Sequence, residues 1–97
     1  MPEARVSEPE PATLALAGAL VFDTVSDALR RARDCVRAGR HDTLDLDGVT
    51  AVDSAGLACV LAIMAAARRR GGTLRVTHVP DDLAALARVC EVESLLA

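Results

Sequence analysis

Residues 53 and 54, an aspartate followed by a serine, are the part of the sequence best suited to chemistry. They stand just before an apolar run of helical period that begins at Leu57, and both residue types are good helix N-caps. The first backbone N–H groups of a helix lack intrahelical acceptors, and the helix dipole favours negative charge there. We therefore expect the Ser54 hydroxyl to lie at a helix start, where it could be phosphorylated or held by a partner.

Nearby carboxylates suggest a second chemistry. Asp45, Asp47 and Asp53 could form a magnesium-dependent phosphoacceptor site like that of response-regulator receivers. Those receivers also need a lysine, and all 11 basic residues of this chain are arginine. A plainer alternative stays open, in which Asp53 and Ser54 only cap a helix.

No catalytic motif accompanies these residues. The sequence has no Gly-rich phosphate-binding loop with lysine, no His-Glu-x-x-His metal site and no nucleophile elbow. Cys35, Cys59 and Cys90 are odd in number, widely spaced and each among apolar residues, so we expect reduced, buried thiols rather than metal ligands. We expect no enzyme activity, no cofactor and no bound metal.

Charge and composition argue against nucleic acid as the main partner. The formal net charge is -3, and a single Phe with no Trp or Tyr offers no aromatic platform for stacking bases. The local basic cluster at 68–70 is interpreted as a solvated helix end. The apolar run before it is too short to span a bilayer, and the N-terminus does not resemble a signal peptide. We therefore expect a cytoplasmic protein without direct membrane insertion.

Composition and periodicity divide the chain into elements. Residues 1–11 carry three prolines and three glutamates, which is typical of a disordered tail and leaves 12–97 as the domain. His41 is expected to be solvated in a loop, and His78 is expected to be structural. The expected strands lie over 13–17, ended by Gly18 with residues 20–22 as a continuation or a loop, over 44–47, ended by Gly48, and over 73–79. The expected helices run from a Thr24–Asp27 capping box to about Gly39, over 55–70 and from Pro80, with a last apolar turn over 92–96.

This alternation predicts one α/β domain, with a small, mixed, mostly parallel β-sheet packed with about three to four helices. The helix over 55–70 carries a core stripe at Leu57, Val60, Leu61 and Met64, but its alanine-rich remaining faces are nearly apolar too. Such a helix is covered on more than one side or presents a partner-binding face.

The order of elements, the stretch from Leu44 to Leu57 and the Gly71-Gly72 entry to the next strand resemble the STAS domain of anti-sigma-factor antagonists. The resemblance covers about residues 12–97. In that family, the Asp-Ser-x-Gly-Leu step matches the site whose hydroxyl is phosphorylated by a partner kinase. Ser54 is the matching residue here.

The C-terminal segment is similar to one branch of this family, the MlaB-like STAS subunits of bacterial Mla phospholipid-transport ABC complexes. The similar stretches are 79–83, 86–89 and 92–96. This resemblance implies a non-enzymatic accessory subunit that binds the cytoplasmic ATPase, supports its stability and activity, and is peripheral to the inner membrane through the complex. The alternative is an anti-sigma-factor antagonist that binds an anti-sigma factor kinase and is switched by phosphorylation at Ser54. The implied partner-binding or phosphoacceptor-like residues are Asp53, Ser54, Ala55, Gly56 and Ala58.

Overall fold

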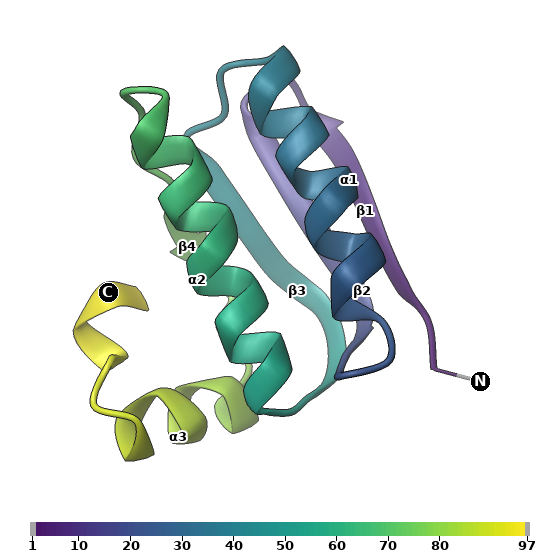
Figure 1. The fold of residues 1–97 in the computed structure, drawn as a ribbon, viewed down its shortest axis with the longest axis vertical. Helices are drawn as coiled ribbons and strands as arrows, with labels where there is room; N and C mark the ends of the chain where they lie inside the picture. The colour runs from purple at the N-terminus through teal and green to yellow at the C-terminus, as the bar shows by residue number, and fades with distance from the viewer. Residues whose placement is uncertain (1, 97) are drawn as a thin grey trace.

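The computed structural model describes residues 2–96, in which helices alternate with strands after an initial strand pair (Figure 1). The sheet order is β1-β2-β3-β4, with β1 antiparallel to β2 and the other two pairs parallel. The predicted α/β domain with a mixed, mostly parallel sheet is therefore confirmed. In chain order the elements are β1 (Ala4–Glu10), β2 (Thr13–Leu20), α1 (Val25–Ala38), β3 (Thr43–Val52), α2 (Ser54–Arg69), β4 (Arg75–Thr77), α3 (Asp81–Val89) and the short 3-10 helix η1 (Glu93–Leu96).

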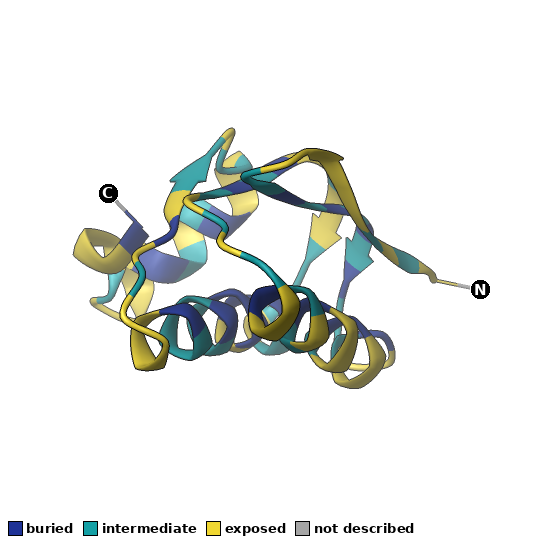
Figure 2. Ribbon diagram, turned by 90° about the horizontal axis from the view of Figure 1, so that it is seen from above, coloured by how far each residue is buried: buried dark blue, intermediate teal, exposed yellow. Residues whose placement is uncertain are grey.

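The hydrophobic core lies between the sheet and the helices. Helices α1 and α2 lie side by side across one face of the sheet (Figure 1), and dark blue buried segments of both layers face each other (Figure 2). In β2 every second residue from Leu14 to Leu20 is buried, and the same period buries Leu44 and Leu46 in β3. Alternate side chains of a strand point to opposite faces, so these leucines form the sheet's contribution to the core.

Strand β1 corrects the prediction of a disordered tail over residues 1–11. Residues 4–7 pair with residues 18–15 of β2, and the half-buried Ala4 and Val6 pack against the core. Proline and glutamate suggested disorder, but an edge strand leaves one side in water and tolerates both residue types. The folded part of the chain therefore begins at residue 4 rather than 12. Met1 lies outside the described residues.

Two glycines expected to end strands lie inside them instead. Strand β3 continues through Gly48 to Val52, and β2 continues through Gly18 to Leu20. A Cβ at residue 48 would lie 2.7 Å from the Cβ of Ala17, and one at residue 18 would lie 2.2 Å from the carbonyl oxygen of Glu3. These glycines allow neighbouring segments to approach closely. From sequence alone, a glycine in such a pattern predicts the end of a strand.

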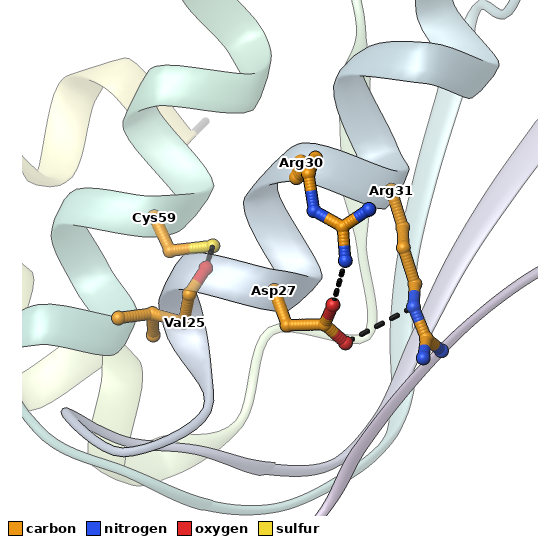
Figure 3. Close-up of polar contacts among 5 residues, drawn as sticks. All are labelled: Val25, Asp27, Arg30, Arg31 and Cys59. Atoms are coloured by element: carbon orange, nitrogen blue, oxygen red, sulfur yellow. Dashed lines mark hydrogen bonds and ion pairs between the residues drawn. The ribbon is translucent and has the colours of Figure 1, made fainter.

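Helix α1 begins without the predicted capping box. The backbone of Thr24 is already in the helical region, and its side chain makes no cap bond. Its hydroxyl instead donates to the carbonyl oxygen of Ala19 at 2.6 Å, which ties the loop to the end of β2. Asp27 binds Arg30 and Arg31 on the helix surface (Figure 3).

One histidine and two of the three thiols differ from expectation. The side chain of His41 is 1% exposed, and its Nε2 lies 2.7 Å from Glu8 of β1. The expectation of a solvated His41 was wrong because it treated the β1 segment as a tail.

Cys59 is buried, and burial raises its pKa to about 11. Cys35 is only half-buried and Cys90 is exposed, since Cys90 follows the last residue of α3.

Removal of residues 2–10 should destabilise the domain. The deletion would uncover the edge of β2 and remove the apolar contacts of Ala4 and Val6 with the core. We expect the free energy of unfolding to fall by about 2 kcal/mol or more. Chemical denaturation of the full and shortened chains measures the difference, with Glu3→Gln as a control that keeps the strand. Equal midpoints for the full and shortened chains would show that β1 adds no stability.

Candidate functional site

Asp53 joins the start of α2 to the loop between β2 and α1. Its Oδ1 accepts the N–H of Gly56 at 3.1 Å, and its Oδ2 accepts the N–H of Phe22 at 3.0 Å. Its extended backbone is typical of a residue that precedes a helix. Asp53, and not Ser54, is therefore the N-cap, and Ser54 is the first residue of α2.

The same hydrogen bonds hold the Asp53 carboxylate in its charged form. The N–H of Phe22 is the largest cause that lowers the pKa of Asp53, and the N–H groups of Gly56 and Ala55 add to it against a smaller desolvation cost. Both carboxylate oxygens accept backbone donors. Asp53 therefore positions the helix start and is poorly placed to accept a transferred group.

Gly56 lets the first turn of α2 lie against the end of β2. A Cβ here would lie 2.2 Å from the carbonyl oxygen of Leu20 and 2.5 Å from Cγ2 of Val52. The N–H of Asp53 donates to the same Leu20 carbonyl at 3.3 Å. The packing therefore demands a residue without a side chain at this position.

Ser54 and Ala58 form the accessible side of the helix start. Both residues are exposed, and residues four apart on a helix share one face. Ala55 is half-buried and Gly56 is buried. The structure thus leaves Ser54 and Ala58 open to a partner and uses Asp53 and Gly56 to place them. Other sides of α2 contact α1 and α3, so the expectation of cover on more than one side is confirmed.

Phe22 is a neighbour of this site that the sequence analysis missed. Its side chain is 79% exposed, although it is the one aromatic residue of the chain. Its hydrogen bond to Asp53 places it beside the start of α2. Exposed aromatic rings are typical of binding surfaces, so a lone Phe in a loop was the signal. We call Phe22, Ser54 and Ala58 the serine face.

The three carboxylates considered as a phosphoacceptor site do not gather. Asp45 lies near the start of β3, and eight residues of extended chain, about 25 Å, separate it from Asp53. Its Oδ1 lies 2.8 Å from Nδ1 of His78 and accepts the N–H of Asp47 at 3.0 Å. Desolvation opposes the charge on Asp45, but these bonds together lower its pKa. Within residues 2–96, no group of three or more His, Cys, Asp or Glu is arranged to hold a metal ion.

A family model described as "Mlab, STAS domain" matches residues 4–97. The chain belongs to the STAS domain family. STAS domains are generally non-enzymatic binding or regulatory domains, and they interact with protein partners such as kinases or transporter components. No curated protein matches the chain by sequence.

Solved structures show the same STAS fold. The anti-sigma factor antagonist SpoIIAA in its unphosphorylated form has 14% identity and a TM-score of 0.73, over 95% of this chain and 84% of that one. The Bacillus cell fate determinant SpoIIAA in its phosphorylated form has 14% identity and a TM-score of 0.69, over 95% and 86%. A sulfate transporter family protein from Wolinella succinogenes has 20% identity and a TM-score of 0.67, over 88% and 70%.

This STAS domain contains, within its described residues, no helix with the length and apolar character that crossing a membrane requires.

Gly56→Ala should destabilise the STAS domain, because the added methyl group meets the backbone of β2. We expect a loss of about 1–3 kcal/mol in the free energy of unfolding, the usual cost of overpacking. Gly72→Ala is the matched control, since its Cβ would meet only an ordinary contact at 3.6 Å. Thermal melting compares the two variants, and equal melting temperatures would contradict the close contact of α2 with β2.

The pair of His78 and Asp45 should make stability depend on pH. The hydrogen bond between the two side chains raises the pKa of His78. The folded state therefore holds the proton of the His78 imidazolium more tightly than the unfolded chain does. The contribution of the pair to the free energy of unfolding is complete below the ordinary histidine pKa of 6.5. It is lost as pH rises through the higher pKa that His78 has in the folded state.

His78→Gln should therefore cost more stability at about pH 5.5 than at about pH 8.5. Comparing wild type with the variant at each pH cancels the titration of other groups. It also cancels the cost of the left-handed backbone at residue 78, where φ is 56°. A difference in melting temperature that does not change with pH would show that the pair adds no protonation-dependent stability.

Proposed function

We propose that this STAS domain is a non-enzymatic accessory subunit of an Mla-type phospholipid-transport ABC complex. In this role it binds the cytoplasmic ATPase and supports the stability and activity of that ATPase. The match to the family described as "Mlab, STAS domain" supports this branch. The domain would then be cytoplasmic and held at the inner membrane through the complex.

The observation that carries the proposal is the serine face. It combines an aromatic side chain that is 79% exposed with a hydroxyl and a small residue on the first turns of α2. Buried aromatic anchors commonly dominate binding energy at protein interfaces. The backbone beneath this face is held by the bonds of Asp53, so little ordering is needed when a partner binds.

A second candidate is an anti-sigma-factor antagonist switched by phosphorylation at Ser54, with an anti-sigma factor kinase as partner. The likeness of fold to SpoIIAA favours it. So does the position of Ser54 at a helix start, because the helix dipole stabilises an added phosphate. Incubation with a cognate kinase and ATP, followed by mass spectrometry, separates the candidates. Full modification of Ser54 would favour the antagonist, and a stable complex with the ATPase would favour the subunit.

Ser54→Glu should weaken ATPase binding much more than it weakens folding. Because Asp53 supplies the cap bond, we expect changes at this exposed position to alter the free energy of unfolding by only about 0.5 kcal/mol. A charge on the serine face must lose its water in the complex, which should weaken binding about tenfold or more. Ser54→Ala should weaken binding less, by about threefold. Calorimetric titration of the purified partners and thermal melting provide both readouts.

Ser7→Glu is the control for added charge, since Ser7 is exposed on β1. Phe22→Ala tests the same face independently and should also reduce affinity while the melting temperature stays close to that of wild type. If Ser54→Glu and Phe22→Ala both bind the ATPase as tightly as wild type, the serine face is not the contact. Asp53 and Ser54 would then belong only to the start of a helix.

A further inference from the structure

Two adjoining hollows lie where α1 and α2 end, at the far end of α2 from the serine face. Figure 1 shows the C-terminal ends of both helices at the same end of the molecule. One hollow of about 130 Å³ includes Arg40 and Arg70, and one of about 480 Å³ includes Arg33, Arg69 and Arg70. Val36 lines both, so the two hollows form one groove. We call it the arginine groove, with the residues Arg33, Arg40, Arg69 and Arg70.

The charges of this groove are not neutralised by neighbouring acidic groups. Among residues 2–96, none of its four arginines has a carboxylate within 4.0 Å. Five further arginines do have such partners: Arg5, Arg30, Arg31, Arg37 and Arg88. Figure 3 shows Asp27 bridging two of them. Of these five, Arg37 also lines the larger hollow, where it is paired with Asp34 at 3.5 Å. Among the described residues, six arginines have no such partner, and the groove holds four of them, while Arg68 and Arg75 lie outside both hollows.

Helix ends alone do not explain the groove. Cations in the last turn of a helix stabilise its dipole, which accounts for Arg69 in α2. Arg33 lies in the interior of α1, and Arg40 follows its end. Within residues 2–96, the buried side-chain nitrogens without a hydrogen-bond partner are Nε of Arg33 and Nδ1 of His41. Both residues line the hollows, and buried polar atoms are rarely left without a partner.

The chemistry of the groove favours an acidic polypeptide. Its floor includes the apolar side chains of Val36, Ala66 and Ala67, while its rim carries guanidinium groups that bind carboxylates in a bidentate manner. A single-stranded nucleic acid is commonly held by aromatic stacking as well as by basic groups, but the one aromatic residue follows β2, before the start of α1. A lipid surface is bound most firmly where apolar side chains insert beside basic groups. The exposed large apolar residues of the described chain are Phe22, Val89 and Leu95, which lie outside both hollows.

We propose that the arginine groove binds an acidic segment of a partner protein, with at least two carboxylates and an apolar side chain between them. The carboxylates pair with the arginines, and the apolar side chain lies on the floor. This inference goes beyond the proposed function, because the groove and the serine face are separated by the length of α2, about 24 Å.

Fluorescence anisotropy at low ionic strength tests the proposal. The probe is a fluorescein-labelled peptide of glutamate, valine and serine, and the same peptide with glutamine for glutamate is the probe control. We expect the acidic peptide to bind and the glutamine peptide not to bind. Arg69→Gln with Arg70→Gln should weaken binding about tenfold or more. Added salt should weaken binding by the wild-type protein.

Arg75→Gln with Arg88→Gln is the matched control, since both residues are exposed and the change in net charge is the same. It should change affinity by less than about twofold. Melting temperatures of both double variants verify their folding. Ser54→Glu should bind the peptide as wild type does, so that failure of the proposed ATPase contact leaves this test unaffected.

Four results would overturn the proposal. The first is that the acidic peptide does not bind, and the second is that both double variants lose the same affinity for it. The third is that phosphatidylserine vesicles or single-stranded RNA displace the peptide at a concentration lower than that of the peptide itself. The fourth is a wild-type dimer that Arg69→Gln with Arg70→Gln converts to monomer. The last two would assign the groove to another class of partner or to a second copy of this chain.

Discussion

The contact between the first turn of α2 and the end of β2 governs the position of every residue in the candidate site. Gly56 permits the contact, because any side chain there would collide with the Leu20 carbonyl. Asp53 holds it in place, with one carboxylate oxygen on α2 and the other on the loop that carries Phe22. A shift of this turn would move Ser54 and Phe22 together. It would also displace Leu57 and Val60, which are buried residues of the same helix.

This arrangement separates residues that build the site from residues that a partner can touch. Asp53 carries the charge, yet backbone donors occupy both of its oxygens. Ser54, one residue later, is exposed and free of the capping role. The division explains how such a helix start can serve as a contact or a modification site without catalytic groups. Ser54 lies on the exposed side of the helix start and takes no part in the cap bond that Asp53 makes.

Helix α2 connects two surfaces of different chemistry. Its first turn belongs to the serine face, and its last turn contributes to the arginine groove. The helix contacts both α1 and α3, and its buried residues extend from Gly56 to Ala67. A helix packed along this length is a rigid spacer, so a partner that spans both surfaces would meet them at a fixed separation.

Periodicity along the chain was enough to predict the α/β class, the mostly parallel sheet and the helix start at residues 53–57. The family was predicted from the resemblance of the stretch from Leu44 to Leu57 and of the order of elements. These features depend on neighbours a few residues apart, which sequence displays directly. Packing between distant segments decided the rest. The β1 strand exists because Ala4 and Val6 meet the core, and its presence buries His41. The carboxylate of Asp53, which caps α2, also accepts a donor from Phe22, 31 residues away in sequence. The arginine groove joins residues 33–40 to residues 69–70 because parallel strands return each helix in the same direction. Local pattern cannot reveal such contacts, since each depends on which surfaces the folded layers bring together.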